Sequence, residues 1–364
     1  NTKRKMKVLK FGGTSVGSAQ RMKEVAKLIT DGEQKIVVLS AMSGTTNTLV
    51  EISDYLYKKN PEGANEIINR LEAKYKQHVN ELYSTDEYKQ KTQEFIKAQF
   101  DYIRSYTKDI FTLFEEKVIL AQGELISTNM VTNYLQEQGV NAILLPALEF
   151  MRTDKNSEPD PVYIKEKLAA QLEIHPDAEI YITQGFICRN AYGEIDNLQR
   201  GGSDYTASLI GAAVNASEIQ IWTDIDGMHD NDPRIVDKTS PVRHLHFEEA
   251  AELAYFGAKI LHPTCVQPAK YANIPVRLLN TMEPTAPGTL ISNDTEKGKI
   301  KAVAAKDNIT AIKIKSSRML LAHGFLRKVF EIFESYQTSI DMICTSEVGV
   351  SVSIDNTKHL NEIL

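Results

Sequence analysis

Short apolar runs separated by amphipathic segments dominate the beginning of the chain. Residues 7–11 and 35–39 are rich in apolar side chains, and both runs end in loops of small residues. Between them, residues 19–29 have the apolar spacing of a helix. Apolar strands that alternate with helices are typical of a parallel sheet covered on both faces. The pattern therefore predicts an α/β fold with a mostly parallel central sheet.

The pattern changes to long helices between residues 47 and 116. Apolar side chains recur there at intervals of three and four residues, as one buried helix face requires; they are Ile67, Leu71, Tyr75, Val79 and Leu82. The Lys and Glu residues between them are interpreted as a solvated face. Strands are then predicted at 142–145, 179–183, 218–222 and 275–279, and helices at 204–214 and 247–260. A helical insertion at about 47–118 thus interrupts the α/β pattern.

A polar segment at residues 292–299 breaks the periodicity and marks a predicted domain boundary. After it, strand, helix, strand and strand are expected at 309–314, 324–336, 339–345 and 349–354. This order is half of a ferredoxin-like α+β unit. The expected domains are therefore residues 1–294 and a smaller, incomplete unit at 295–364.

Composition narrows the possible functions. The chain has 364 residues, of which 42% are hydrophobic and 25% charged, as in ordinary globular proteins. Its net charge of -6 gives no support for nucleic-acid binding, which needs a basic excess. No apolar stretch approaches the ~20 residues that cross a bilayer, and the three cysteines form no CxxC pair for zinc. We therefore expect a cytoplasmic protein whose anion sites are built from a few local cations and backbone N–H groups.

Three glycine-rich or polar loops follow apolar strands, and such loops converge at the carboxyl edge of an open parallel sheet. The first contains Gly12 and Gly13, which allow backbone N–H groups to approach a phosphate. Lys10 precedes these glycines, which reverses the Walker A order and excludes a P-loop as the template. Taken alone, this loop is better interpreted as a plain strand-to-helix turn.

The second loop runs from Leu198 to Ala207 and has two interpretations. Ser203 and Asp204 can cap the helix that follows. Arg200, held beside the amides of Gly201 and Gly202, can clamp a carboxylate or a phosphate. The two roles can coexist.

The third loop, residues 222–234, is rich in acidic side chains. It does not fit a calcium-binding EF-hand, because no Glu stands at the required position. A nucleotide-binding loop in which Arg234 reaches a phosphate is the better interpretation. Lys259 supplies a further cation near a strand end, whereas His262, beside a proline, is interpreted as structural. No nucleophile and base are paired, so Ser-His-Asp hydrolysis has no support.

Several motifs, in order along nearly the whole chain, resemble those of the aspartokinases, a branch of the amino-acid kinase superfamily. They are Lys-Phe-Gly-Gly-Thr-Ser at 10–15, Gly-Glu at 123–124, Arg-Gly-Gly-Ser-Asp-Tyr at 200–205, Trp-Thr-Asp-Ile-Asp-Gly at 222–227, Asp-Pro-Arg at 232–234, the segment 247–259 and Ala-Pro-Gly-Thr at 286–289. The resemblance implies a three-layer amino-acid kinase fold. It also implies transfer of the γ-phosphoryl group of ATP to the β-carboxylate of L-aspartate, the first step in lysine, threonine and methionine biosynthesis.

The resemblance also implies roles for individual residues. Lys10 would contact the transferring phosphoryl group, and Asp204 would organise the basic groups around it. L-Aspartate would be held by Ser40, Thr46, Glu124, Arg200, Gly201, Gly202 and Ser203, with Glu124 on the α-ammonium and Arg200 on a carboxylate. ATP would lie against Lys10, Gly12, Gly13, Thr223, Asp224, His229, Arg234, Lys259 and Ile260. His229 stands where the family usually has an aromatic residue, which leaves its packing against the nucleotide open.

The chemistry agrees with these roles. A carboxylate nucleophile is already anionic, so it needs no general base, and the sequence offers no obvious one. The obstacle is repulsion between two anions, which positioning and local positive charge overcome. Mg²⁺ is expected to be held mainly by ATP and water, because no carboxylate cluster suggests a dedicated protein cage.

The C-terminal unit resembles the ACT regulatory domain of lysine-sensitive aspartokinases. The residues implied in binding an inhibitory amino acid are Met319, Ala322, Gly324, Phe325, Leu326, Asp341, Thr345, Ser346 and Glu347, with Asp341 on the ammonium group. Lysine is the favoured effector, and threonine is the next. The family normally carries a second ACT unit, so we expect a truncated chain. Such domains pair between subunits, which implies a homodimer or a higher homo-oligomer.

Two other functions remain open. A related carboxylate kinase, such as a glutamate 5-kinase, would share the fold, but the helical insertion, the segment 247–253 and the ACT-like unit favour an aspartokinase. A catalytically silent amino-acid sensor would use the same fold only to bind ligands. The retention of Lys10, Glu124, Arg200 and Asp204 together argues against a sensor.

Overall fold

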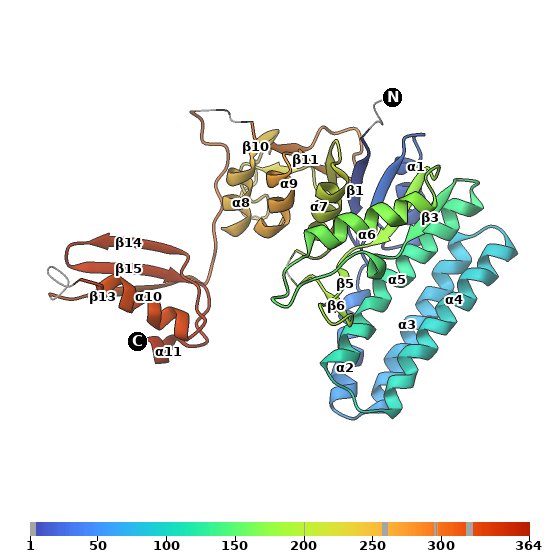
Figure 1. Ribbon diagram of the computed structural model, residues 1–364, viewed down its shortest axis with the longest axis horizontal. Helices are drawn as coiled ribbons and strands as arrows, with labels where there is room; N and C mark the ends of the chain where they lie inside the picture. The colour runs from blue at the N-terminus through green and yellow to red at the C-terminus, as the bar shows by residue number, and fades with distance from the viewer. Residues whose placement is uncertain (1–4, 200, 257–260, 295, 297, 318–322) are drawn as a thin grey trace. The chain divides into compact units, whose positions relative to one another are not determined.

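The computed structural model describes residues 5–199, 201–256, 261–294, 296, 298–317 and 323–364. The chain divides into two compact units, Asn1–Ala304 and Ala305–Leu364, which are coloured along the sequence in Figure 1. This division falls after the polar segment at 292–299, whereas the sequence places the boundary within it.

An eight-stranded sheet forms the centre of the first unit, in the order β10-β12-β11-β7-β1-β2-β4-β3. The strands are β1 Lys7–Phe11, β2 Lys35–Leu39, β3 Ala142–Leu145, β4 Ile180–Gln184, β7 Ile219–Thr223, β10 His244–His246, β11 Val276–Asn280 and β12 Thr289–Ser292. Neighbouring strands pair in parallel, except that β11 and β12 are antiparallel. The predicted α/β fold with a mostly parallel sheet is confirmed. Strands β4, β7 and β11 are each displaced by one residue from their predicted ranges.

Helices cover both faces of this sheet, because alternate side chains of a strand point to opposite sides. On β2, Val37 and Leu39 enter one hydrophobic core, while Ile36 and Val38 enter the other. The first core is closed by α1 Ala19–Ile29, α2 Thr45–Tyr57, α3 Pro61–Leu82, α4 Asp86–Ser105 and α5 Leu113–Glu137. The second is closed by α6 Pro161–Ile174, α7 Gly202–Val214, α8 Phe247–Tyr255 and α9 Gln267–Tyr271. The first unit therefore has three layers, helices, sheet and helices (Figure 1).

The helical insertion forms a long hairpin of α3 and α4, which runs alongside α5 in Figure 1. α3 begins at Pro61, and Asn60 caps it by accepting a hydrogen bond from the Gly63 N–H at 3.0 Å. The five side chains predicted to form its apolar face are all buried. Tyr75 of that face meets Phe100 of α4, with 5.9 Å between the ring centroids. The insertion is thus held to the first core by its apolar face.

Two helices of the first unit, α7 and α8, differ from their predicted ranges. α7 begins at Gly202, and its N-cap is Gly201, whose φ of 81° is left-handed. Ser203 and Asp204 therefore lie inside the first turn, and the prediction that they cap this helix is wrong. α8 ends at Tyr255, whereas the sequence predicts helix as far as residue 260; residues 257–260 lie outside the described part of the chain.

The second unit contains a three-stranded antiparallel sheet in the order β13-β15-β14. Its elements are β13 Thr310–Lys315, α10 Phe325–Ser335, β14 Met342–Ser346, β15 Gly349–Ile354 and α11 Leu360–Ile363. Val329 and Phe333 of α10 pack against alternate apolar residues of β13 and β15. The predicted order of strand, helix, strand and strand is confirmed.

Across the residues that the structure describes, no helix is both long enough and apolar enough to span a bilayer.

Candidate active site

The loops that follow β1, β2 and β7 meet at one edge of the sheet, because these strands are parallel neighbours. Phe11, at the end of β1, is in register with Leu39 of β2 and with Trp222 of β7. The glycine loop after β1 is therefore flanked by the loop after β2 and by the acidic loop after β7. Two of the three loops singled out in the sequence thus lie side by side.

The centre of this edge is an ion pair between Lys10 and Asp204. The Lys10 Nζ lies 2.8 Å from the Asp204 Oδ1, and the two side chains are only 12% and 17% exposed. Lys10 stands on β1, and Asp204 lies in the first turn of α7, which packs against β1. A Cβ on Gly12 would lie 3.4 Å from the Lys10 Nζ, so the ammonium reaches the glycine loop as well. This arrangement fixes a cation where a phosphate could approach both Lys10 and backbone N–H groups.

The glycine loop lies directly against the loop after β2. A Cβ on Gly13 would lie 2.9 Å from the Ala41 carbonyl oxygen, a separation that a side chain does not tolerate. The Ser43 N–H donates to the Gly13 carbonyl at 3.1 Å. Glycine at position 13 is therefore required by the close approach of the two loops.

Glu124, on α5, lies behind the loop after β2 and is 3% exposed. Its Oε1 accepts a hydrogen bond from the Ala41 N–H at 3.2 Å, whereas its Oε2 has no hydrogen-bond partner among the described residues. Burial raises the pKa of this carboxyl to about 8. A buried carboxylate is stable only when it is paired, so the open oxygen suits a positively charged group such as an ammonium.

Two serines connect this pocket to α7. The Ser40 hydroxyl donates to the Ser203 Oγ at 2.9 Å, and Ser127 of α5 donates to the Ser40 carbonyl at 2.8 Å. Ser203 is the residue before Asp204, so these hydrogen bonds end next to the Lys10–Asp204 ion pair. The structure thus brings together Ser40, Glu124 and Ser203 of the predicted aspartate ligands, and Thr46 lies in the first turn of α2 that follows the same loop.

The loop before α7 is packed against a buried thiol. A Cβ on Gly201 would lie 2.1 Å from the Cys265 Sγ. Burial, with the Asp204 charge acting in the same direction, raises the pKa of the Cys265 thiol to about 12. The thiol therefore stays protonated at neutral pH and acts as a packing group, not a nucleophile. Arg200, the predicted carboxylate clamp, lies outside the described residues.

The start of the acidic loop is tied to β11 and to the glycine loop. Thr281, which follows β11, donates its hydroxyl to the Thr223 carbonyl at 2.9 Å. Ser15 in turn donates to the Thr281 Oγ1 at 3.4 Å. These bonds set Thr223 and the adjacent Asp224 beside the glycine loop, where a nucleotide is predicted to bind.

The other predicted ATP contacts are less closely tied to this centre. The His229 Nδ1 lies 2.9 Å from the Thr239 hydroxyl. Arg234 is 62% exposed and pairs with Asp232 at 2.5 Å, so its contact with a phosphate stays a prediction. Lys259 and Ile260 lie outside the described residues.

The residues predicted to bind an effector belong to the second unit. Gly324 is the N-cap of α10, with a φ of 82°, and Phe325 and Leu326 form the first turn. Thr345 and Ser346 are exposed at the end of the edge strand β14, and Asp341 and Glu347 flank that strand. Met319 and Ala322 lie outside the described residues. The effector site therefore stays a prediction.

Several residues that build the site were not predicted from the sequence, namely Thr45, Ser127, Cys265 and Thr281. Thr281 directly follows a strand of the parallel sheet, and this position is a signal that could have identified it. Ser127 lies one helical turn after Glu124, and Thr45 adjoins Thr46. Cys265 gave no such signal, because its role depends on packing against a loop distant in sequence.

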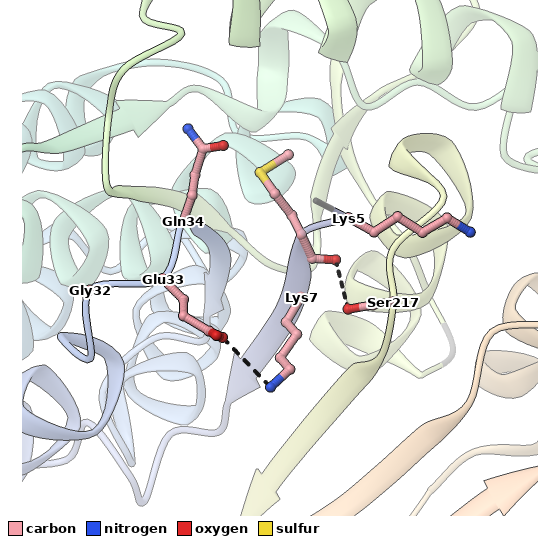
Figure 2. Close-up of a pocket in the computed structure, with 7 residues that line it drawn as sticks. Lys5, Lys7, Gly32, Glu33, Gln34 and Ser217 are labelled. Carbon is pink, nitrogen blue, oxygen red and sulfur yellow. Dashed lines mark hydrogen bonds and ion pairs between the residues drawn. The ribbon is translucent and has the colours of Figure 1, made fainter. Parts of the chain in front are cut away.

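A cavity of about 540 Å³ lies at the opposite, amino edge of β1 and β2, lined by residues 5–7, 32–34 and Ser217. Figure 2 shows Lys7 pointing toward Glu33, at 3.8 Å, and Ser217 hydrogen-bonded to the Met6 carbonyl. The Lys7 side chain in this cavity is 42% exposed, whereas that of Lys10 is 12% exposed. In the part of the chain that the structure describes, no three His, Cys, Asp or Glu side chains gather as metal ligands.

Comparisons with known proteins agree with this geometry. Residues 5–280 match the family model described as the amino acid kinase family. The lysine-sensitive aspartokinase 3 of Escherichia coli is 35% identical over 355 residues, which cover 96% of this chain and 78% of that protein. The chloroplastic aspartokinase 1 of Arabidopsis thaliana is 38% identical over 369 residues, covering 96% of this chain and 63% of that protein. The chain spans 63%, 65% and 66% of the lengths of three Arabidopsis aspartokinases, less than two thirds of each.

Solved structures give the same assignment. E. coli aspartokinase III in complex with aspartate and ADP has a TM-score of 0.83 at 34% identity, covering 97% of this chain and 79% of that one. The aspartate kinase of Clostridium acetobutylicum has a TM-score of 0.82 at 27% identity, covering 98% of this chain and 81% of that one. The chain therefore belongs to the amino acid kinase family and, within it, to the aspartokinases.

Proposed function

We propose that this chain is an aspartate kinase, which transfers the γ-phosphoryl group of MgATP to the β-carboxylate of L-aspartate. The observation that carries the proposal is the partly buried Lys10–Asp204 ion pair, which lies between the Glu124 pocket and the loop after β7. Although the protein has a net charge of -6, Lys10 would place a positive charge where the carboxylate of aspartate approaches the phosphates of ATP. That the similar E. coli structure contains aspartate and ADP supports both ligands.

The aspartate would lie between α5 and α7. The open Glu124 Oε2 would accept the α-ammonium group, and the hydroxyls of Ser40 and Ser203 would bind carboxylate oxygens. Arg200, Thr46 and the amides of Gly201 and Gly202 would complete the carboxylate contacts. These contacts would direct the side-chain carboxylate of a four-carbon amino acid toward Lys10. The carboxylate of a longer amino acid would extend past that position.

The reaction needs little proton chemistry. A β-carboxylate oxygen of aspartate bonds to the γ-phosphorus of ATP, while the bond from that phosphorus to the bridging oxygen of ADP breaks. The products are an acyl phosphate, 4-phospho-L-aspartate, and ADP. The Lys10 ammonium would offset the negative charge on the phosphoryl oxygens, and Asp204 would hold that ammonium in place.

Mg²⁺ would supply additional charge neutralisation on the ATP phosphates. The donor set fits an ion held mainly by phosphates and water, since Asp204 is already paired with Lys10. Asp224, exposed after β7, is the carboxylate that could bind the ion directly or through water.

The proposal is tested by trapping the acyl phosphate. With MgATP and hydroxylamine, aspartate is expected to yield the aspartyl hydroxamate, with one ADP released for each hydroxamate formed. Glutamate that works as well as aspartate would assign the chain to another carboxylate kinase. Ligand binding without ADP release would instead identify an amino-acid sensor.

The role of Lys10 is tested by Lys10→Ala. Loss of one fixed charge at a transferring group is expected to lower kcat by about 100-fold or more. Lys35→Ala is the matched control, because Lys35 is a buried lysine paired with Asp31 at the amino end of the neighbouring strand. It is expected to reduce stability and to leave kcat close to that of the unsubstituted protein. Equal losses of kcat in both variants would remove Lys10 from the reaction.

We also propose feedback control through the second unit. The relative in E. coli is named lysine-sensitive, and a similar solved structure of that enzyme contains lysine and aspartate. Lysine would bind at the start of α10 and the end of β14, with threonine as the next candidate, and the unit would pair with that of a second subunit. Adding each amino acid to the ADP assay tests the effector, and sedimentation tests the dimer.

A further inference from the structure

A hydrogen bond connects the helical hairpin to the start of α2. The Tyr75 hydroxyl, on α3, lies 2.6 Å from the Thr45 Oγ1, and the two residues are 1% and 2% exposed. Thr45 is the first residue of α2. The Tyr75 ring is fixed by contact with Phe100 of the partner helix α4. The bond therefore lies in a dry, packed region where water cannot replace it.

The opposite side of Thr45 is held by α5. A Cβ on Gly123 would lie 2.7 Å from the Ala41 Cβ and 3.4 Å from the Thr45 Cγ2, so α5 and the start of α2 are in direct contact. Burial raises the pKa of the Tyr75 phenol, and the charge of Glu124 acts in the same direction. Tyr75, Thr45 and Glu124 thus form one buried cluster.

The sequence neighbours of this cluster are the proposed ligands of aspartate. Thr46 follows Thr45 in the first turn of α2, and Glu124 follows Gly123 on α5. A displacement of Thr45 therefore changes the separation between Thr46 and the Glu124 carboxylate. Because a displacement of about 1 Å at a substrate-positioning group can have large kinetic effects, the bond that restrains Thr45 bears on the amino-acid site.

We propose that Tyr75 is a positioning residue for the amino-acid substrate: its hydroxyl fixes Thr45, and through it the spacing of Thr46 and Glu124. This inference rests on the proposed aspartate kinase activity. The helical hairpin would then have a function besides closing the first core, because it would set the geometry of the aspartate pocket. It would not affect the positions of the loops that bind the nucleotide.

The test is the isosteric variant Tyr75→Phe in the full chain. Loss of one buried hydrogen bond is expected to raise the KM for aspartate by about threefold to tenfold. The KM for ATP and kcat are expected to change by less than about twofold, because Lys10 and the loop after β7 keep their positions. Thr45→Val removes the same bond from the other side and should have the same effect. The double variant should add nothing further, as expected of two partners in one interaction.

Tyr83→Phe is the matched control. Tyr83 is also buried, at 3% exposed, and its hydroxyl donates to the Met130 carbonyl at 2.6 Å; among the described residues, no hydrogen bond joins it to a proposed aspartate ligand. It should lower the Tm and leave the KM for aspartate unchanged. If Tyr75→Phe fails to fold, Thr45→Val provides the same readout.

The outcomes separate the two proposals. An active wild-type protein in which Tyr75→Phe or Thr45→Val lowers only the Tm, as Tyr83→Phe does, overturns the positioning role alone. A folded wild-type protein without aspartate-dependent ADP release overturns the proposed kinase activity and, with it, this inference.

Discussion

Glu124 shows how the environment of one residue determines what it can bind. Its burial penalises the charged form, and the Ala41 N–H donates to Oε1, whereas Oε2 accepts no hydrogen bond from the described residues. With a pKa of about 8, this carboxyl is largely protonated at neutral pH unless a cation pairs with it. The ammonium of an amino acid would supply the missing partner and favour the carboxylate. Binding of the substrate and ionisation of Glu124 are therefore linked.

The raised pKa of Glu124 also makes the stability of the fold depend on pH. The folded pKa of Glu124 lies above its ordinary value of 4.5, so folded protein keeps a proton that unfolded protein releases. The stability contributed by this protonation is fully present below about pH 4.5 and is lost as the pH rises toward 8. Above that range, the buried carboxylate destabilises the fold until a cation pairs with it.

The same linkage predicts the pH dependence of aspartate binding. Below pH 8, the KM for aspartate should rise by about tenfold for each pH unit by which the pH is lowered, because the substrate ammonium binds only the ionised carboxyl of Glu124. Initial rates between pH 6 and 9 measure this slope. Glu124→Gln should show a higher KM that no longer depends on pH over this range. A wild-type KM that is flat from pH 6 to 8 would contradict the raised pKa, and a Glu124→Gln variant with the wild-type KM would contradict Glu124 as the ammonium ligand.

At the scale of elements, the strands and the long helices could be predicted because their apolar patterns are local. The buried run of β2 and the apolar face of α3 are examples, and both are buried as predicted. The start of α7 could not be predicted in this way. Ser203 and Asp204 suggest a cap, but the left-handed conformation of Gly201 places the helix start before them. Gly201 also lies so close to Cys265 that an added Cβ would collide with its sulfur, and this packing between residues distant in sequence leaves no local signal.

Gly201→Ala tests the importance of this turn. The added Cβ faces both an unfavourable φ of 81° and the Cys265 Sγ, so the loop that carries Ser203 and Asp204 must shift. We expect kcat/KM for aspartate to fall by about 100-fold. Gly193→Ala is the control, because Gly193 has a φ of 80° and no atom within 4 Å of the added Cβ. It should cost about 1 kcal/mol of stability and leave the kinetics unchanged.

A double variant separates the effect of the left-handed backbone at position 201 from that of the collision with the Cys265 sulfur. Gly201→Ala with Cys265→Ala removes the sulfur that the new Cβ would meet, so part of the lost activity should return. If the double variant is no more active than Gly201→Ala alone, the contact with Cys265 does not position the loop.

At the scale of the whole molecule, the active site depends on contacts between segments that are far apart in the chain. Lys10 meets Asp204, Ser40 meets Ser203, and Ala41 meets Glu124. The resemblance to the aspartokinases implied roles for Lys10, Asp204, Ser40, Ser203 and Glu124 but not for Ala41. The order of parallel strands predicted that the loops after them would meet at one edge. It could not predict Tyr75 as a partner of Thr45, because a tyrosine on an apolar helix face is equally well explained by core packing.

The most direct test of the account is a crystal structure of the protein with ADP, Mg²⁺ and L-aspartate. The account predicts that the aspartate ammonium lies against Glu124, and that its β-carboxylate and the ADP phosphates face each other across the Lys10 Nζ. A structure in which the two ligands occupy separate regions, with Lys10 facing neither, would contradict it.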